Sequence, residues 1–421
     1  MRPSNPTGRP AGCRHDRRGG RLRRRPGAHL VPRRARGRCG PLRRTRRVAG
    51  AAAGGRRGRR DARPSHGQPR GGDHRRAQCR GRGDRRPRGD GRPSRCQPGR
   101  HRLRPLDDPE HLRPGPCPAK DWGPGDEVVV TRLDHDANIR PWVQAAEAVG
   151  ATVRWAAFDR QSAELPTWAI TDLLHERTRL VAVTGASNLL GTRPDVPAIA
   201  AAAHSVGALV HLDAVHLTPH APIDLPSLGV DFVACSPYKF FGPHHGVLAA
   251  APAVLEAIRP DKLLPSTDRV PERFELGTLP YELLAGTAAA VDVIADLVPG
   301  KGSRRERILA SMAAAEAYED TLWHRMVDGL DTIPGVVRYG RPERHTPTVL
   351  FSVTGVDSRA VYEHLATRGV NAPAGSFYAL EASRWLGLGD DGAVRAGLTP
   401  YTDDSDVDRL LEAVAEAAAR A

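Results

Sequence analysis

From Asp121 onward, short apolar runs alternate with longer segments of helical pattern. The apolar runs predict strands at 127–131, 152–155, 180–184, 208–213, 232–235 and 246–250, and the segments between them predict helices at 139–149, 167–176 and 195–205. Continuously apolar strands separated by helices are typical of a largely parallel sheet that is covered on both faces. We therefore expect an α/β fold whose ligand binds at the carboxyl ends of the strands.

In the C-terminal part of the chain, strands and helices do not alternate regularly. The pattern there predicts a long helical stretch at 281–330 with a break near Pro299 and Gly300, a strand at 347–353, and helices at 358–368 and 404–420. This mixture favours a smaller α+β domain. We expect a large domain at 119–290 and a small C-terminal domain at 291–421, a division that suits domains of ordinary size.

Residues 1–118 differ from everything that follows them. They contain 36 arginines and 8 acidic residues, a net charge of +28, whereas the rest of the chain has a net charge of −13. The segment has no Phe, Trp, Tyr, Ile or Lys. Because it cannot bury enough apolar surface to offset the conformational entropy of the chain, we expect a disordered arm.

Two interpretations of this arm compete. A basic arm can bind nucleic acid through the phosphates, although this one has no aromatic residues for base stacking. Alternatively, the arm is not a natural reading frame. GC-rich DNA that is translated out of frame yields Arg, Gly, Pro and Ala, and the composition of the arm matches this. The first interpretation makes the chain a nucleic-acid-binding protein. The second leaves open an inactive product with an aberrant N-terminus.

The cysteines and the apolar runs indicate where the chain resides. Five of the six cysteines lie in the arm without metal-ligand spacing, and Cys235 is the sixth. This usage argues against a disulfide framework and for the reducing cytoplasm. No apolar run is long enough for a membrane span, and the N-terminus has no apolar core of a secretory signal.

Lys239 is the first candidate for a catalytic residue. The chain has four lysines against 59 arginines, and Lys239 lies just after the predicted strand 232–235. An arginine serves for surface charge, but only a lysine amine forms a Schiff base. A metal site made of His211, Asp213 and His216 is the alternative for this region. It has no fourth ligand at a typical spacing and leaves Lys239 unexplained, so we predict no metal.

Five segments together resemble the class V aminotransferase and cysteine desulfurase family. They are 134–142 (DHDANIRPW), 187–192 (SNLLGT), 211–216 (HLDAVH), 231–243 (DFVACSPYKFFGP) and 274–278 (FELGT). The resemblance implies a pyridoxal-phosphate (PLP) enzyme with the aspartate aminotransferase fold, fold type I, acting on an amino acid. Transamination, racemisation and elimination all stay open, since each begins with the loss of a substituent from Cα.

The resemblance also implies roles for individual residues. Lys239 looks like the Schiff-base lysine, Asp213 like the carboxylate that pairs with the pyridine nitrogen, and His135 like the imidazole that stacks on the ring. The other implied cofactor contacts are His216 and Asn188 at the phenolic edge, Ser236 and Tyr238 beside the lysine, and Thr278 reaching the phosphate from a neighbouring subunit. That last contact implies a homodimer.

The implied substrate contacts include one departure from the family. Arg395 resembles the arginine that clamps the substrate carboxylate, and Asn188 lies beside the same site. Ser376 stands about where desulfurases carry their cysteine nucleophile. Because a serine hydroxyl cannot form a persulfide, we expect a desulfurase-like scaffold without persulfide chemistry.

A second departure concerns the start of the large domain. The family binds the PLP phosphate at a Thr-rich or Gly-Thr turn that opens a helix about 30 residues before the histidine loop. Here residues 106–113 read LDDPEHLR, which offers carboxylates to a dianion. We suggest that the arm is a frame-shifted copy of the expected N-terminal part. On that interpretation, the chain lacks the first helix and this turn.

Overall fold

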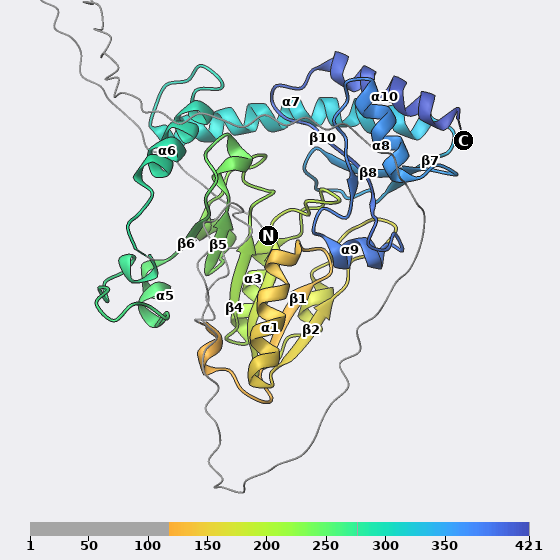
Figure 1. Ribbon diagram of the computed structural model, residues 1–421. Helices are drawn as coiled ribbons and strands as arrows, with labels where there is room; N and C mark the ends of the chain where they lie inside the picture. Colours follow the sequence, from red (N-terminus) through yellow and green to blue (C-terminus); the bar gives the residue numbers. More distant parts are fainter. Residues whose placement is uncertain (1–117, 276, 421) are drawn as a thin grey trace, which may run out of the picture. The chain divides into compact units, whose positions relative to one another are not determined.

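The computed structural model describes residues 118–275 and 277–420, which form two sheets with their helices (Figure 1). The predictions for residues 1–117 of the arm, including its disorder and its nucleic-acid binding, lie outside this range. In the described part, no helix is both long enough and apolar enough to cross a membrane.

The first sheet is the expected parallel sheet. Its strands, in the order β2-β1-β3-β4-β5-β6, are β1 Glu127–Thr131, β2 Thr152–Ala156, β3 Thr178–Thr184, β4 Leu209–Asp213, β5 Phe232–Cys235 and β6 Val247–Ala250. Neighbouring strands are parallel, except that β5 and β6 are antiparallel. The predicted α/β fold with a mainly parallel sheet is confirmed, with strand bounds close to those expected.

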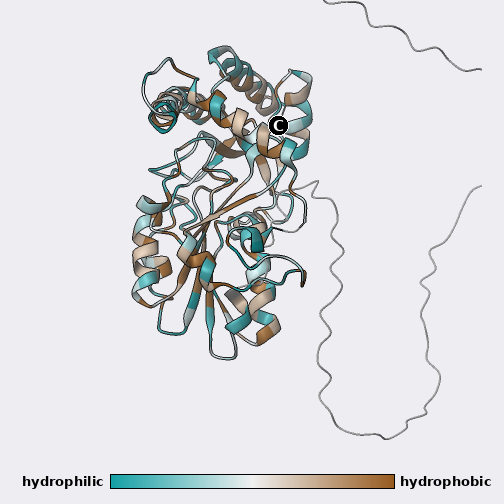
Figure 2. Ribbon diagram, turned by 90° about the vertical axis from the view of Figure 1, so that its left-hand side faces the viewer, coloured by the Kyte–Doolittle hydropathy of each residue, from teal (hydrophilic) through white to brown (hydrophobic). Residues whose placement is uncertain are grey.

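Helices cover both faces of this sheet, which is why its inner strands β1, β3 and β4 are almost wholly buried. α1 (Arg140–Val149) packs on the face that carries Val128 and Val130. α3 (Val196–Ser205) packs on the opposite face, which carries Val129. In Figure 2 the helices show hydrophilic and hydrophobic residues side by side, as expected of helices with one buried side.

The second sheet is antiparallel and belongs to the C-terminal part. Its strands, in the order β7-β8-β10-β9, are β7 Val336–Tyr339, β8 Thr348–Val353, β10 Ala393–Gly397 and β9 Ala374–Gly375. Three helices share its hydrophobic core: α7 Arg304–Thr332, α8 Ser358–Thr367 and α10 Asp404–Ala418. The predicted smaller α+β unit is confirmed.

The remaining helices are short, apart from α6. They are α2 Trp168–Thr171, α4 Leu225–Leu228, α5 Pro252–Ala257, α6 Tyr281–Ala295 and α9 Leu380–Trp385, with 3-10 turns at Pro118–Asp121, Asp136–Asn138, Pro237–Phe240 and Glu272–Phe274. The helix predicted at 167–176 is therefore only one turn. Its second half is a turn in which the backbone N–H of His175 donates to the Thr178 hydroxyl at 3.1 Å.

The predicted break in the long helical stretch separates α6 from α7. α7 begins at Ser303, whose hydroxyl accepts a hydrogen bond from the Glu306 backbone while the Glu306 carboxylate accepts one from the Ser303 backbone. This capping box fixes a new helix start after Pro299 and Gly300. The predicted domain boundary at residues 290 and 291 falls inside α6 and stays a prediction.

Gly191 connects the two sheets at a close approach. Its φ is +78°, and a Cβ there would lie 2.9 Å from the backbone oxygen of Thr346.

We expect Gly191→Ala to lower the free energy of unfolding by roughly 2–3 kcal/mol, because backbone strain and steric overlap add. Urea denaturation measures this loss. Gly207→Ala is the matched control, since Gly207 has φ +80° and no atom within 4 Å. An equal loss in both variants would contradict the close approach.

Candidate active site

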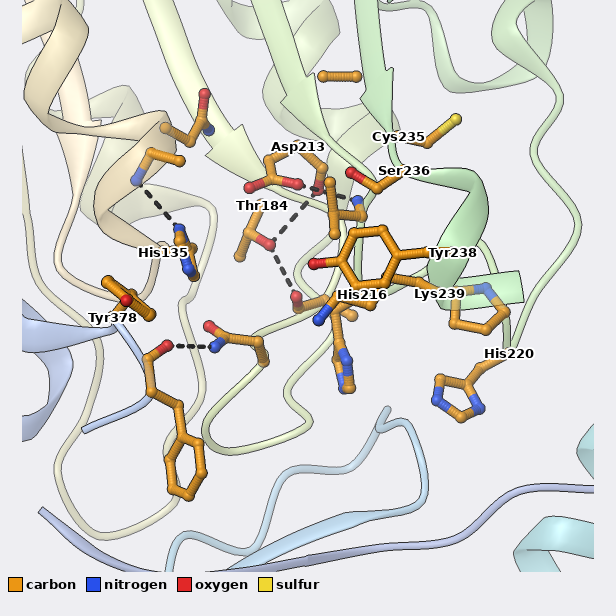
Figure 3. Close-up of a pocket in the computed structure, with 18 of the residues that line it drawn as sticks. His135, Thr184, Asp213, His216, His220, Cys235, Ser236, Tyr238, Lys239 and Tyr378 are labelled. Carbon is orange, nitrogen blue, oxygen red and sulfur yellow. Dashed lines mark hydrogen bonds between the residues drawn. The ribbon is translucent and has the colours of Figure 1, made fainter. Parts of the chain in front are cut away.

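A cavity of about 490 Å³ lies at the carboxyl ends of β3, β4 and β5 (Figure 3). The C-terminal unit closes it from the other side with Phe377, Tyr378 and Arg395. Eight residues that the sequence predicted as site residues line this cavity: His135, Asn188, Asp213, His216, Ser236, Tyr238, Lys239 and Arg395.

Asp213 is the last residue of β4. Parallel pairing aligns it with Thr184 at the end of β3 and with Ala234 in β5. The residue is buried, and its Oδ1 accepts a hydrogen bond from the Val215 backbone N–H at 2.9 Å. A buried carboxylate held at the edge of the sheet can accept a hydrogen bond from an N–H cation of a ligand in the cavity.

Lys239 lies in the 3-10 turn Pro237–Phe240 that follows β5 directly. The turn closes when the Gly242 backbone N–H donates to the Pro237 oxygen at 2.8 Å. A Cβ on Gly242 would lie 2.8 Å from the Pro237 Cβ, so only glycine fits there. The turn places the Lys239 amine in the cavity, 4.7 Å from the centroid of the Tyr238 ring (Figure 3).

His135 follows β1 and has one defined tautomer. Its Nδ1 accepts a hydrogen bond from the Ala137 backbone N–H at 3.0 Å. In the neutral ring the hydrogen is therefore on Nε2. The ring lies 5.5 Å from that of Tyr378, with an angle of 35° between the two planes.

The loop that carries Phe377 and Tyr378 is strained and well anchored. The two residues have φ values of 52° and 59°, a left-handed backbone that costs about 1–2 kcal/mol for each residue other than glycine. The oxygen of Phe377 accepts from Asn188 Nδ2 at 2.8 Å, and that of Tyr378 accepts from the Asp136 backbone N–H at 2.8 Å. These bonds offset the strain and hold the loop against the first sheet.

A buried polar network supports the cavity from the α1 side of the sheet. Asp134 accepts hydrogen bonds from the Thr131 hydroxyl and, at 2.6 Å, from Asn138 Nδ2. The Asn138 oxygen in turn accepts from His211 Nδ1 at 2.9 Å. Burial lowers the pKa of His211 to about 4 and raises the pKa of Asp134 to about 8. Both groups are therefore mostly uncharged at neutral pH.

His216 is held by two threonine hydroxyls, one at the start of β8 and one just before it. Its Nε2 lies 3.0 Å from the Thr346 hydroxyl and 3.1 Å from that of Thr348. Burial, together with the positive charges of Arg395 and Lys239 nearby, holds the pKa of His216 well below its usual range. A neutral imidazole at this point can donate or accept one further hydrogen bond.

Arg395 in β10 is an oriented cation. Its Nη1 donates to the Asn188 backbone oxygen at 2.7 Å, and its guanidinium carbon lies 3.9 Å from the centroid of the Phe377 ring. Burial lowers its pKa to about 10, which still keeps it charged at neutral pH. An anchored and stacked guanidinium suits a carboxylate ligand.

Two predicted site residues lie apart from the cavity. Thr278 is exposed, in the segment that leads to α6, and Ser376 is half-buried beside β9 without lining the cavity. The predicted role of Thr278 requires a second subunit, so a single chain does not bring it to the site. Ser376 immediately precedes Phe377, whose side chain does reach the cavity.

Several cavity residues were not predicted from the sequence as site residues. They are Thr184, His211, His220, Cys235, Phe241, Phe377, Tyr378 and Tyr401. His220 and Cys235 had a usable signal, because each lies close to the end of a predicted strand. Phe241 had one too, since it lies in the segment 231–243 that carries the resemblance. Phe377, Tyr378 and Tyr401 had none, because they come from loops of the C-terminal unit.

Comparison with known proteins identifies the family. The family model described as aminotransferase class-V matches residues 117–410. The chain belongs to the class-V aminotransferase family. Members of this family are PLP-dependent enzymes. The expected family and enzyme class are thus confirmed, and the match leaves residues 1–116 uncovered.

Curated relatives and solved structures agree with this assignment. An uncharacterised protein of Mycobacterium tuberculosis is 37% identical over 70% of this chain and 74% of its own length. A probable cysteine desulfurase of Mycobacterium leprae is 34% identical over 70% of this chain and 69% of its own length. The crystal structure of the Escherichia coli cysteine desulfurase CsdA superposes with a TM-score of 0.65 at 27% identity, covering 74% of this chain and 76% of that chain.

The lowered pKa of His211 predicts a pH-dependent contribution to stability. Between the ordinary value of 6.5 and the folded value of about 4, the unfolded chain binds a proton that the folded chain does not. His211 therefore destabilises the fold as the pH falls through this window, by at most about 1.4 kcal/mol per pH unit. Wild type should therefore lose stability relative to His211→Gln as the pH falls through this window. Urea denaturation of the two proteins at several pH values measures this change in their difference in unfolding free energy.

Asp134 affects the pH dependence of stability in the opposite direction to His211. The wild type must therefore be compared with a variant that lacks only His211. Its raised pKa of about 8 lets the folded chain hold a proton that the unfolded chain releases, so Asp134 stabilises the fold as the pH falls. Both proteins retain Asp134, so this contribution cancels in the difference. A difference between them that is independent of pH would contradict a buried, neutral His211.

Proposed function

We propose that this chain binds PLP covalently through Lys239 and uses it to transform an amino acid. The observation that carries the proposal is that the Lys239 amine and the Asp213 carboxylate, which follow adjacent parallel strands, line one cavity. These groups suit PLP, because an amine bonds an aldehyde carbon and a carboxylate accepts a hydrogen bond from a protonated ring nitrogen. When bound, PLP supplies an electron sink for negative charge at the substrate Cα.

Each predicted residue then has a task. Asp213 would hold the protonated ring nitrogen, and His135, whose Nδ1 accepts from the Ala137 N–H, would offer its ring to the cofactor. His216, Asn188, Ser236 and Tyr238 would supply the remaining contacts. Arg395 would bind the substrate carboxylate and so orient Cα, and the Lys239 amine would take up and return the proton at Cα.

The thiol in the cavity does not substitute for a desulfurase nucleophile. Cys235 is the cysteine of the described residues, and burial raises its pKa to about 11. At neutral pH it is a thiol rather than the thiolate that attacks sulfur. Ser376, at the position of the family's cysteine, has only a hydroxyl. We therefore propose PLP chemistry that does not pass sulfur to the protein.

Thr278 supports the proposal of a homodimer. Its hydroxyl is the predicted phosphate ligand, yet within one chain it is exposed and does not line the cavity. A second copy of the chain would supply it.

Lys239→Ala tests the covalent link directly. Wild-type protein loaded with PLP should absorb in the visible region, and borohydride should fix a pyridoxyl group on Lys239 that mass spectrometry locates. In Lys239→Ala both signals should be lost, because no other amine in the described residues lines the cavity. Lys262→Ala is the control, since Lys262 binds Ser266 and Asp268 away from the cavity. Labelling of Lys262 in place of Lys239 would overturn the proposal.

The fate of sulfur tests the second part of the proposal. After incubation of the PLP-loaded protein with L-cysteine, no persulfide should be found on Cys235 by mass spectrometry, because its thiol stays protonated. Cys235→Ala should leave any turnover within about twofold of wild type. A persulfide on Cys235, or loss of turnover in Cys235→Ala, would show that this cysteine is a nucleophile.

A further inference from the structure

His220 and Glu319 form a buried pair at the cavity that the proposed function does not use. His220 lines the cavity on the side of His216, beyond Lys239 (Figure 3). Its Nδ1 lies 3.0 Å from Oε2 of Glu319 in α7. Glu319 is only 1% exposed, and its Oε1 has no hydrogen-bond partner among the described residues.

The burial of Glu319 restricts the protonation states of the pair. An unmatched charge at such a depth is strongly unfavourable, so the pair is net neutral. In one neutral arrangement an ionised Glu319 faces a doubly protonated His220, and both ring nitrogens carry a hydrogen. In a second, a protonated Glu319 donates to Nδ1 of a neutral His220, and the single ring hydrogen is on Nε2. In a third, Nδ1–H donates to a Glu319 that is protonated on Oε1, but this buried O–H then has no acceptor among the described residues, which is unfavourable. Nε2 therefore carries a hydrogen in the two favoured arrangements.

The surroundings of His220 favour an acceptor with negative charge. Its ring contacts that of His216 edge-on, with 5.4 Å between the centroids. Arg395 acts electrostatically on His216, so a cation that is not bonded to the proposed cofactor lies in the same part of the cavity. The Glu319 charge is already matched within the pair. An N–H donor near this guanidinium suits a carboxylate better than a cationic group.

We propose that His220 binds the side chain of the substrate through its Nε2–H, and that the substrate is an amino acid with an acidic side chain. Glu319 is the positioning residue, since it fixes the ring and the hydrogen on Nε2. This inference rests on the proposed function, because it assigns the α-carboxylate to Arg395 and leaves the side chain to face His220.

Binding to the PLP-loaded protein tests the substrate class. Spectral titration should give dissociation constants for L-glutamate and L-aspartate at least about tenfold lower than for L-norvaline and L-2-aminobutyrate, which have uncharged side chains of similar length. In His220→Ala this preference should fall below about threefold while the affinity for L-norvaline is retained. His204→Ala is the matched control, because His204 pairs with Asp231 at 2.9 Å outside the cavity.

Glu319 needs a readout that a merely structural role would not change. Glu319→Ala should lose the preference for acidic amino acids, and Glu319→Asp should restore part of it, with circular dichroism confirming that both variants are folded. In the wild type, nitrogen-15 NMR of the histidine side chains should show a protonated Nε2 on His220 at neutral pH, with or without PLP. An unprotonated Nε2 would overturn the inference even if the variants failed to fold.

The outcomes separate this inference from the proposed function. If PLP bonds Lys239 but acidic and apolar amino acids bind with equal affinity, this inference fails and the proposed function stands. If L-norvaline loses affinity in His220→Ala as much as L-glutamate does, His220 is not a side-chain contact. If PLP does not bond Lys239, the proposed function fails, and the substrate class fails with it.

Discussion

Parallel pairing of β3, β4 and β5 is the constraint on which the site depends. The register aligns Thr184, Asp213 and Ala234, so three buried strands end at the same edge of the sheet. The turn after β5 then brings Lys239 back over that edge. A shift of β4 by one residue would move Asp213 to the opposite face. The apolar packing of α1 and α3 on the two faces therefore serves the chemistry, because it fixes the register.

Four histidines line the cavity, and their environments differ. His135 is fixed by a backbone N–H, and His211 by the oxygen of Asn138. His216 lies against two threonine hydroxyls, whereas His220 faces a carboxylate. The neighbours decide which ring nitrogen carries a hydrogen. In this way one residue type supplies four differently held imidazole groups within a single cavity, and we propose different tasks for them.

Most of the fold and eight of the residues that line the cavity could be predicted from the sequence, because both depend on local patterns. The strands are continuous apolar runs, and Asp213, Ser236 and Lys239 lie at or just after strand ends, so alternation along the chain is enough to place them. The pair of His220 and Glu319 was missed because its members are 99 residues apart and meet only when α7 packs beside the loop after β4. The left-handed backbone at Phe377 and Tyr378 was missed because neither residue is a glycine or an asparagine.

The anchoring of Arg395 has a consequence for recognition. One of its terminal nitrogens is occupied by the Asn188 carbonyl and its plane lies against Phe377, so the group has little freedom left to lose when a ligand arrives. A guanidinium that is already ordered spends less of the binding energy on its own immobilisation. Its position is fixed as well. A ligand carboxylate that binds Arg395, as we propose, is therefore held at a set place relative to the Lys239 turn, which lines the same cavity.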